Sequence, residues 1–541
     1  MKHDTSDSRQ LLKFFLITFF IFSSQSFLFY LLIPISYFFS IKLFASTILI
    51  SAPVFIFRKR PGIYIAIASF FSLIIIAVNF FYYLTYQTEM TIGGLEAILN
   101  SNPGESYEYL MGEKNKLGIT LGITLALMVL YLYLIRQHLP GNLKIKKKHS
   151  LVFLLLFIPA LALAGLKPGR IYPVIIANLF YEYFSNTVYI SELKHINADQ
   201  DFKVRRKTDF NKKEIHVIVI GESMRKAQLP YYGYQRETTP LLNTVSDLIY
   251  FNDVISPATL TIPSITTILT SLTACEASSY SNLSVLLLAK KMNFRTVWIS
   301  NQCRAGRWEA KISAIAEAAD ETFFVNTTCS GRTSGQYDEN LLPFFKQVLS
   351  GQHEKKLIII HLFGSHGAYD KRYPESFDHF KEKADNRLTE KEAQIINAYD
   401  NSIRYTDYIL YELLMALDKT KAVSSLVYLS DHGENLYDDD RKNQGHGGLP
   451  VPTSFEVEIP MFVWFSKTFD TYNPVMIKNA LNNIDKPVSS ENLFYAVADL
   501  LNIDFQGMDT SKSFFNSAYL PEKRMIFTPK NECIPYESIF R

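Results

Sequence analysis

The feature that most constrains this chain is a series of long apolar runs confined to its first 166 residues. Phe14–Ile33, Ile63–Tyr86 and Leu117–Ile135 contain no charged residue, and each is long enough to cross a hydrocarbon core of about 30 Å as a helix. Leu43–Phe57 and Leu151–Leu166 are shorter, so they either cross with help from flanking residues or form buried or interfacial helices. We predict five spans, which excludes a wholly soluble protein.

Charges between these runs predict the orientation of the chain. Basic residues gather at the N-terminus, at Arg58–Arg60 and at Arg136–Lys148, and the positive-inside rule places all three on the cytoplasmic side. The loop Gln87–Lys116 carries five glutamates and is expected outside. Five crossings then place the C-terminal part outside as well. We expect a transmembrane domain (1–167), an interfacial linker helix (within 168–211, chiefly Ile171–Lys194) and a catalytic domain (212–541).

The second half of the sequence alternates short β-rich runs with helical stretches. This alternation is typical of an α/β domain with a mostly parallel central sheet covered on both faces. The whole chain has 55 basic and 52 acidic residues, which excludes a strongly basic nucleic-acid-binding protein. Four cysteines are too few for a disulfide scaffold. The expected strands are His216–Ile220, Arg295–Ser300, Lys356–Phe363 and Ser425–Ser430, and the expected helices are Ile262–Leu272, Glu309–Ala319, Glu392–Leu417 and Ser490–Leu501.

Three of the expected strands end in residues able to bind a metal. Glu222 follows the first of them, His366 follows the third, and Asp431-His432 follows the fourth, with His446 a little further on. In parallel sheets the ligand site lies beyond the carboxyl ends of the strands. Each residue alone is explained equally well as a helix cap or a surface histidine, but together they predict a metal site. Mixed carboxylate and imidazole ligands suit zinc, with manganese next.

A hydroxyl nucleophile is expected at the start of the helix after Ser256–Thr261. Backbone N–H groups and the helix dipole favour an anion at such a position. A hydroxyl beside a metal ion can attack phosphorus and form a covalent phospho-intermediate. Serine and threonine are also favoured helix caps, so this segment alone does not establish a nucleophile. Thr261 and Thr259 are the two candidates.

With these motifs assembled, the chain resembles the membrane-bound phosphoethanolamine transferases of Gram-negative bacteria. These enzymes belong to the alkaline phosphatase and sulfatase superfamily and include the lipid A modifying enzymes behind colistin resistance. The resemblance extends over nearly the whole chain. The segments that carry it are Val217–Ser223, Tyr232–Pro240, His361–Gly367, Tyr399–Asn401, Ser430–Glu434, His446-Gly447 and Asn102–Ser106.

The resemblance implies specific roles for the candidate residues. Glu222, Thr261, Asp431 and His432 are expected to hold one tightly bound zinc, with a second zinc as an open alternative. Thr261 is the preferred nucleophile because Thr261-Ile-Pro263 matches the sulfatase-type spacing. His366 and His446 are expected to contact the transferred phosphate or a second zinc, and to act as general acid for the leaving group and general base for the acceptor hydroxyl. Asn401 and Arg304 are expected to contact the substrate.

The implied reaction transfers phosphoethanolamine from phosphatidylethanolamine to a lipopolysaccharide acceptor, either an inner-core sugar or lipid A, at the bacterial inner membrane. The cysteines depart from the lipid A branch of the family, and a Cys303–Cys329 bridge is compatible with an oxidising periplasm. The alternatives are a phosphoglycerol transferase or another sulfatase-family hydrolase acting on cell-envelope glycans. A non-enzymatic metal-binding sensor or assembly factor is a third interpretation.

Overall fold

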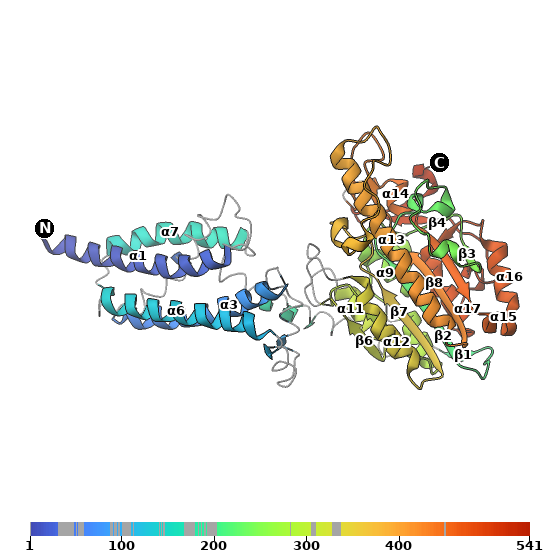
Figure 1. Cartoon of the computed structure of the whole chain (residues 1–541), viewed down its shortest axis with the longest axis horizontal. Helices are drawn as coiled ribbons and strands as arrows, with labels where there is room; N and C mark the ends of the chain where they lie inside the picture. The colour runs from blue at the N-terminus through green and yellow to red at the C-terminus, as the bar shows by residue number, and fades with distance from the viewer. Residues whose placement is uncertain are drawn as a thin grey trace. The chain divides into compact units, whose positions relative to one another are not determined.

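The computed structural model divides the chain into two compact units, residues 1–185 and 186–541. It describes residues 2–30, 59–86, 113–139, 147–166 and, from 203 to 540, all but 282, 305–309, 327–336 and 448–450, with scattered positions in between. The N-terminal unit is helical and the second unit is built around a β-sheet (Figure 1). Each unit is described here by itself.

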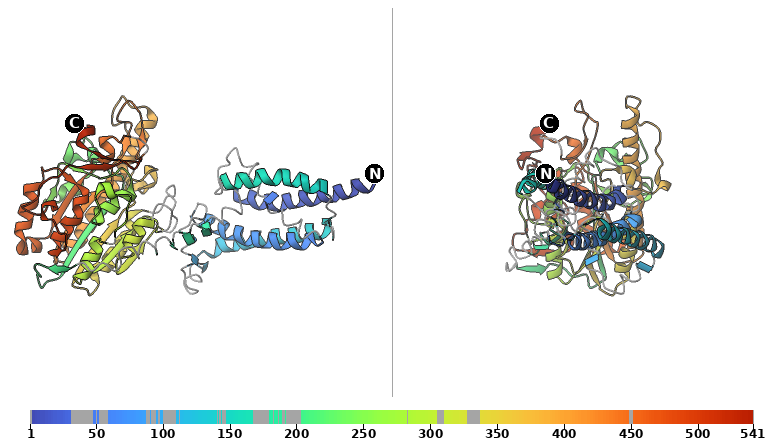
Figure 2. Two further views of the ribbon diagram at one scale, coloured as in Figure 1. Left: turned by 180° about the vertical axis from the view of Figure 1, so that it is seen from behind. Right: turned by 90° about the vertical axis from the view of Figure 1, so that its left-hand side faces the viewer.

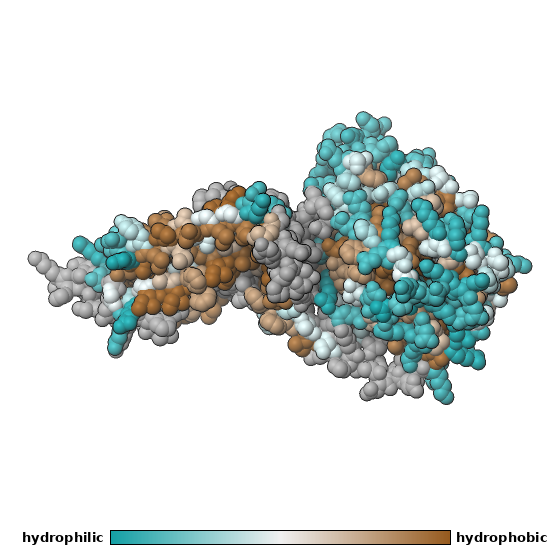
Figure 3. All heavy atoms as spheres, turned by 60° about the horizontal axis from the view of Figure 1, so that its bottom comes forward, coloured by the Kyte–Doolittle hydropathy of each residue, from teal (hydrophilic) through white to brown (hydrophobic). Residues whose placement is uncertain are grey.

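The N-terminal unit consists of long helices whose outward side chains are apolar. They are α1 (Lys2–Tyr30), α3 (Pro61–Tyr86), α6 (Lys114–His138) and α7 (Lys147–Leu166). On α6, Leu121, Leu125 and Val129 are each more than half exposed. On the face shown in Figure 3, the coloured side chains of this unit are mainly apolar, whereas those of the sheet unit are mostly hydrophilic. Apolar helix surfaces of this extent are expected where lipid replaces water as the solvent.

Two stretches in this unit are long and apolar enough to cross a membrane, namely Pro61–Thr85 within α3 and the whole of α6, among the residues described. A shorter apolar stretch, Ser150–Ala162, lies in α7. The predicted run Leu43–Phe57, the outer loop with Asn102–Ser106 and the linker Ile171–Lys194 fall mostly outside the described residues.

The second unit has a seven-stranded sheet in the order β3-β11-β8-β2-β7-β5-β6. Strand β11 pairs antiparallel with β3 and β8, and the other pairings are parallel, so the mostly parallel sheet is confirmed. The four predicted strands are β2, β5, β7 and β8. The bounds are β2 (Glu214–Gly221), β3 (Leu248–Tyr250), β5 (Arg295–Ser300), β6 (Glu321–Phe324), β7 (Lys355–His361), β8 (Val423–Ser430) and β11 (Met461–Phe465).

Helices cover both faces of this sheet (Figures 1 and 2). Every residue of β2 and β8 is buried, because alternate side chains enter two separate cores. One face packs against α9 (Thr261–Leu269), α10 (Val285–Lys291), α11 (Ala310–Ala316), α15 (Lys467–Tyr472), α16 (Pro474–Asn483) and α17 (Leu493–Leu500); the other packs against α12 (Leu342–Ser350) and α13 (Glu390–Asp418).

Small elements complete the described part of the unit. Short strand pairs form around the main sheet, and two one-turn helices follow β10 and β15. They are β1 (Val204–Arg206) with β13 (Ile503–Phe505), β4 (Val254–Ile255) with β12 (Val488–Ser489), β9 (Asn435–Leu436) with β10 (Gln444–Gly445), β14 (Met525–Phe527) with β15 (Cys533–Pro535), α14 (Ser454–Val457) and α18 (Glu537–Phe540).

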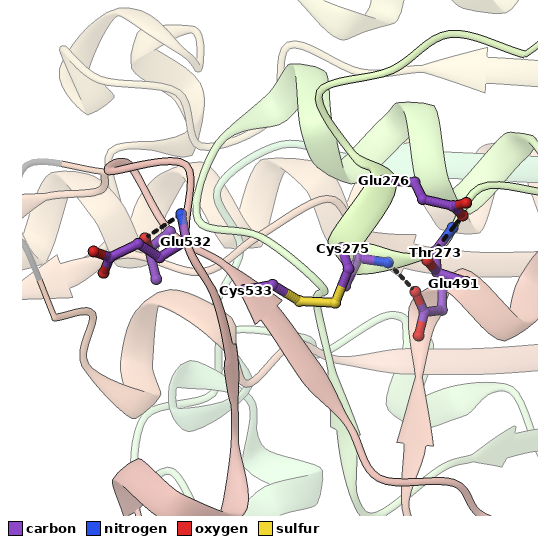
Figure 4. The surroundings of a disulfide bond; sticks show 8 residues. Thr273, Cys275, Glu276, Glu491, Glu532 and Cys533 are labelled. Atoms are coloured by element: carbon purple, nitrogen blue, oxygen red, sulfur yellow. Dashed lines mark hydrogen bonds between the residues drawn. A yellow bond between two sulfur atoms is a disulfide. The ribbon is translucent and has the colours of Figure 1, made fainter.

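A disulfide joins Cys275, next to the C-terminal end of α9, to Cys533 in β15. Figure 4 shows this bridge beside Glu491, which accepts a hydrogen bond from the Ala274 backbone N–H. The sequence analysis did not anticipate it, because 258 residues separate the two cysteines. Cys303 is disulfide-bonded as well, and Cys329, which we paired with it, lies outside the described residues.

Candidate active site

Four residues from two strand ends and one helix start meet at the carboxyl edge of the sheet. Thr261 Oγ1 lies 3.3 Å from Glu222 Oε2 and 3.3 Å from His432 Nε2. His432 Nε2 also lies 3.4 Å from Glu222 Oε1 and 3.3 Å from Asp431 Oδ2. The structure therefore brings Glu222, Thr261, Asp431 and His432 together, and we call this set the ligand cluster.

The local backbone holds Glu222 at this position. Gly364 follows β7 with φ +48°, and a Cβ on it would lie only 2.9 Å from the Glu222 backbone. Only glycine combines this close approach with a left-handed conformation at no steric cost. Ser223, also at positive φ, donates from its hydroxyl to Glu222 Oε1 (2.7 Å). The turn after β2 is therefore built to present the Glu222 carboxylate beyond the strand end.

The protonation state of His432 follows from its hydrogen bond. His432 Nδ1 lies 2.8 Å from the Gly433 carbonyl oxygen. Because a carbonyl only accepts, Nδ1 carries the proton and Nε2 presents a lone pair to Glu222, Thr261 and Asp431. Burial, followed by the positive charge of His446, lowers the pKa of His432 well below its usual range. A neutral imidazole with this orientation is a metal ligand.

Among the residues that the structure describes, histidine is the only basic side chain within ion-pair distance of the carboxylates of the ligand cluster. Asp431 Oδ1 accepts from the backbone N–H groups of Ser223 and His432, while Asp431 Oδ2 is buried without a hydrogen-bond partner. Burial raises the pKa of Asp431 to about 6. Burial and then the charge of Asp431 raise the pKa of Glu222 well above its usual range. A divalent cation fits this donor set, since it would satisfy the orphaned oxygen and both negative charges.

A second pair of charged groups lies next to the ligand cluster. His446 Nδ1 donates to Glu434 Oε2 (2.7 Å), and the Tyr369 hydroxyl donates to Glu434 Oε1 (2.5 Å). Burial opposes the charged form of His446, but the hydrogen bond and negative charge of Glu434 outweigh it and raise the pKa of His446 to about 9. We call Glu434 and His446 the His446 dyad.

The His446 dyad is close enough to the ligand cluster to share a reacting group with it. Ligand atoms of Glu222, His432 and His446 lie within 4.8 Å of one another, and the rings of His432 and His446 have centroids 4.0 Å apart. His446, expected to contact either the phosphate or a second zinc, is therefore placed where it could contact a metal. The Glu434 partner was missed from the sequence, although it lies within the quoted Ser430–Glu434 segment.

His366, which follows β7, lies at the same edge of the sheet and lines a pocket together with Glu222 and Thr261. Its ring stacks on Phe363 and lies 6.5 Å from the His446 ring. Burial, followed by the positive charge of His446, lowers the pKa of His366 to about 4, so the ring is neutral at neutral pH. Its Nδ1 is buried without a hydrogen-bond partner. A phosphoryl oxygen could therefore accept a hydrogen bond from this ring.

The other predicted site residues have different surroundings. Thr259 is 1% exposed and its hydroxyl has no hydrogen-bond partner, whereas Thr261 lies in the ligand cluster. The Asn401 side chain accepts from the backbone N–H groups of His379 and Phe380 and donates to Asp378. These bonds hold a loop next to α13, so the structure does not bring Asn401 to the ligand cluster.

Arg304 likewise points to a structural partner. Its guanidinium forms an ion pair with Glu317 at 2.8 Å. Gln302, two residues earlier, does reach the site, because its amide donates to Glu222 Oε2 (3.2 Å) and to the Leu362 carbonyl (3.0 Å). Gln302 is therefore the residue of this loop whose described hydrogen bonds reach the ligand cluster, and the substrate contact of Arg304 stays a prediction.

Comparisons with known proteins agree with this geometry. A family model described as Sulfatase matches residues 215–503. Phosphoethanolamine transferase EptC of Escherichia coli (strain K12) is 27% identical over 526 residues, which cover 92% of this chain and 90% of EptC. Phosphoethanolamine transferase CptA of Salmonella typhimurium is 26% identical over 519 residues, which cover 90% of this chain and 88% of CptA.

A solved structure is similar to the second unit. The C-terminal periplasmic domain of EptC from Escherichia coli, in complex with Zn, superposes with a TM-score of 0.58 at 29% identity and covers 62% of this chain and 96% of that domain. Since the family model matches more than half of its length, the chain belongs to the sulfatase family, and its resemblance to the phosphoethanolamine transferases of that family is confirmed.

Proposed function

We propose that this protein transfers phosphoethanolamine from phosphatidylethanolamine to a lipopolysaccharide acceptor, an inner-core sugar or lipid A, through a phospho-Thr261 intermediate. The observation that carries the proposal is the position of Thr261 Oγ1, 3.3 Å from both Glu222 and His432 at the first residue of α9. The names of its relatives supply the transferred group.

A zinc ion would be held by Glu222, Asp431, His432 and Thr261. When bound, it supplies positive charge that favours the alkoxide form of Thr261 and offsets the negative charge that develops on the phosphoryl oxygens. The N-terminus of α9 adds unpaired backbone N–H groups to the same position. Relatives include a domain solved in complex with Zn, and the orphaned Asp431 oxygen supports the same ligand set here.

In the first step, Thr261 Oγ, whose hydroxyl proton has already been lost to solvent, attacks the phosphorus of phosphatidylethanolamine, and it is released in the same deprotonated form in the second step. The bond between phosphorus and the glycerol oxygen breaks, and diacylglycerol leaves. The high pKa of His446 keeps this residue protonated at neutral pH, so it donates the proton that the leaving oxygen needs. Neutral His366 is placed to donate a hydrogen bond to the phosphoryl group.

In the second step, an acceptor hydroxyl attacks the phosphorus of phospho-Thr261. His446 is now neutral and takes the proton of that hydroxyl, which restores its starting state. The bond between phosphorus and Thr261 breaks, and phosphoethanolamine remains on the acceptor. Glu434 keeps the His446 ring in one orientation and one tautomer throughout both steps.

Both proposed substrates are anchored in lipid, so a membrane anchor would keep the catalytic domain near them. We propose five crossings, an interfacial linker and a periplasmic catalytic domain, divided at about residues 167 and 211, in the bacterial inner membrane. The exposed apolar side chains of α3 and α6 support such an anchor. An anchored domain works on headgroups held at a fixed depth beside it.

Mass spectrometry of lipopolysaccharide from cells with the wild-type gene, with Thr261→Ala and without the gene tests the function. The proposal predicts one added phosphoethanolamine in the wild type alone, and fragmentation assigns it to lipid A or core sugar. Purified protein given phosphatidylethanolamine or phosphatidylglycerol, each labelled in the headgroup, distinguishes the alternative. Transfer of labelled phosphoglycerol in place of phosphoethanolamine would overturn the proposed donor.

A further inference from the structure

A pocket of about 230 Å³ opens beside the nucleophile, between the ends of β5 and β7 and the helices α9 and α11. Thr261, Glu222 and His366 form one side of it. His361, the last residue of β7, and Ser300, the last residue of β5, line another part. A substituent on a phosphoryl group at Thr261 therefore has direct access to this space.

The polar ring of His361 is buried without a described interaction that would account for its position. It is 1% exposed, and neither ring nitrogen has a hydrogen-bond partner. A buried imidazole that leaves both nitrogens unpaired costs free energy unless a ligand or water satisfies it. The ring is held edge to face by Trp298, with centroids 6.1 Å apart, so its orientation is fixed by packing. Its place on the pocket wall makes it a binding group.

The chemistry of the pocket selects the kind of ligand. Burial lowers the pKa of His361 to about 3, so the neutral ring offers one lone pair and one N–H. Ser300 adds a hydroxyl oxygen, and the Phe324 and Ile312 side chains supply apolar surface. Lone pairs and an aromatic ring favour a small group with N–H donors and a positive charge on a short apolar stem.

We propose that this pocket binds the ethanolamine part of the donor, with its ammonium group donating a hydrogen bond to His361. This inference rests on the proposed function and adds the basis of headgroup selection. The two methylene groups would pack against Ile312 and Phe324. Choline has no N–H to donate and carries three methyl groups, so the pocket discriminates against it.

The test uses the full-length protein in detergent and measures release of diacylglycerol. The donors are phosphatidylethanolamine, its N-methyl and N,N-dimethyl derivatives, and phosphatidylcholine. In the wild type, kcat/KM should fall with each added methyl group. His361→Leu should lower kcat/KM for phosphatidylethanolamine about tenfold to a hundredfold, the worth of one hydrogen bond to a charged group, and should affect phosphatidylcholine little.

Two further variants separate binding from structure. His361→Gln retains an acceptor and should recover part of the selectivity. Ser424→Ala removes another buried hydroxyl without a hydrogen-bond partner, in β8 and outside the pocket, and should leave selectivity unchanged. Tryptophan fluorescence on heating checks that each variant is folded; if His361→Leu is unfolded, the donor series on the wild type and His361→Gln decides the matter.

The outcomes distinguish the two proposals. Suppose that the wild type uses phosphatidylethanolamine but His361→Leu keeps the full preference over phosphatidylcholine. In that case His361 does not bind the ammonium group and only binds water, so this inference is overturned while the proposed function stands. If the wild type treats all four donors alike, headgroup selection by this pocket is also overturned. If no diacylglycerol is released from phosphatidylethanolamine by wild-type protein that contains zinc, the proposed function itself fails.

Discussion

The ligand cluster and the His446 dyad lie side by side but handle charge in opposite ways. In the dyad, Glu434 and His446 pair at 2.7 Å, and the pairing raises the pKa of His446. In the ligand cluster, Glu222 and Asp431 face a histidine whose pKa is lowered. In the dyad, the positive charge of His446 balances the negative charge of Glu434. In the ligand cluster, the two carboxylates need a bound cation to balance their negative charge. In the proposed mechanism, this difference assigns proton transfer to the His446 dyad and phosphoryl transfer to the ligand cluster.

The largest effect is expected at the nucleophile of the ligand cluster. Thr261→Ala should lower diacylglycerol release by about 10⁴-fold or more, since losing a covalent nucleophile removes the entire pathway. Thr261→Ser keeps a hydroxyl and should retain measurable activity. Thr259→Ala provides the comparison that decides between the two candidate hydroxyls. Full activity in Thr261→Ala together with inactive Thr259→Ala would reverse the assignment.

Removal of the cation should separate the ligand cluster from the dyad. Dialysis against a chelator should reduce activity about a thousandfold, because several kcal/mol of charge stabilisation is lost, and zinc should restore it. Asp431→Asn should weaken zinc binding in the same direction, whereas Glu434→Gln should leave zinc content near that of the wild type. Equal loss of zinc in both variants, by elemental analysis, would mean that the dyad also holds the metal.

The His446 dyad should determine how kcat depends on pH. A general acid must be protonated, so activity falls as pH rises through its pKa. Glu434→Gln removes the partner that raises the pKa of His446 and should move the alkaline fall in kcat to lower pH, with about a tenfold to hundredfold loss of rate. Tyr369→Phe removes only a hydrogen bond to Glu434 and should shift the profile less. An unchanged profile in Glu434→Gln would exclude His446 as the acid.

The smallest effect concerns stability of the metal-free protein. The pKa of Asp431 is about 6 in the folded protein, compared with 3.8 for an ordinary aspartate. The folded state therefore binds a proton at Asp431 more tightly than the unfolded state does, and this stabilises the folded protein fully below about pH 4. That stability is lost as pH rises through 6. We expect the unfolding temperature of metal-free protein to fall by about 2–5 °C over this range, and zinc to abolish the fall.

The chain offers a convenient probe for this measurement. Its three tryptophans, Trp298, Trp308 and Trp464, all belong to the sheet unit, so fluorescence follows that unit within the full-length protein. Asp431→Asn should remove most of the pH dependence in the metal-free state. A metal-free wild type whose unfolding temperature rises between pH 4 and pH 6 would contradict the sign.

The strand ends were predictable because their sequence pattern is local. Val217–Ile220 and Leu426–Leu429 are uninterrupted apolar runs followed, after one intervening residue each, by Glu222 and by Asp431, so the parallel-sheet rule alone predicted that they lie together. Strand β11 was missed although its sequence, Met461–Phe465, is equally apolar. Its antiparallel pairing with β8 depends on the return of the chain across the sheet edge, which no local pattern records.

Residues that act through distant partners were less predictable. Asn401 lies in a diagnostic segment, yet its role as a loop anchor depends on Asp378 and Phe380. His361 begins a quoted motif, but only the buried surroundings reveal that its ring lacks a partner. The Cys275–Cys533 bridge joins segments whose proximity is fixed by the whole fold. Spacing along the chain contains none of this information.

The most direct test of the central claim is the site of the covalent intermediate. Full-length protein containing zinc is mixed with phosphatidylethanolamine labelled in the headgroup, quenched in acid, digested and sequenced by mass spectrometry. We predict phosphoethanolamine on Thr261, with no labelled peptide from Asp431→Asn or from chelator-treated protein. Label on Thr259 or on another residue, or active turnover with no labelled peptide at all, would contradict the assignment of Thr261 as the nucleophile of the ligand cluster.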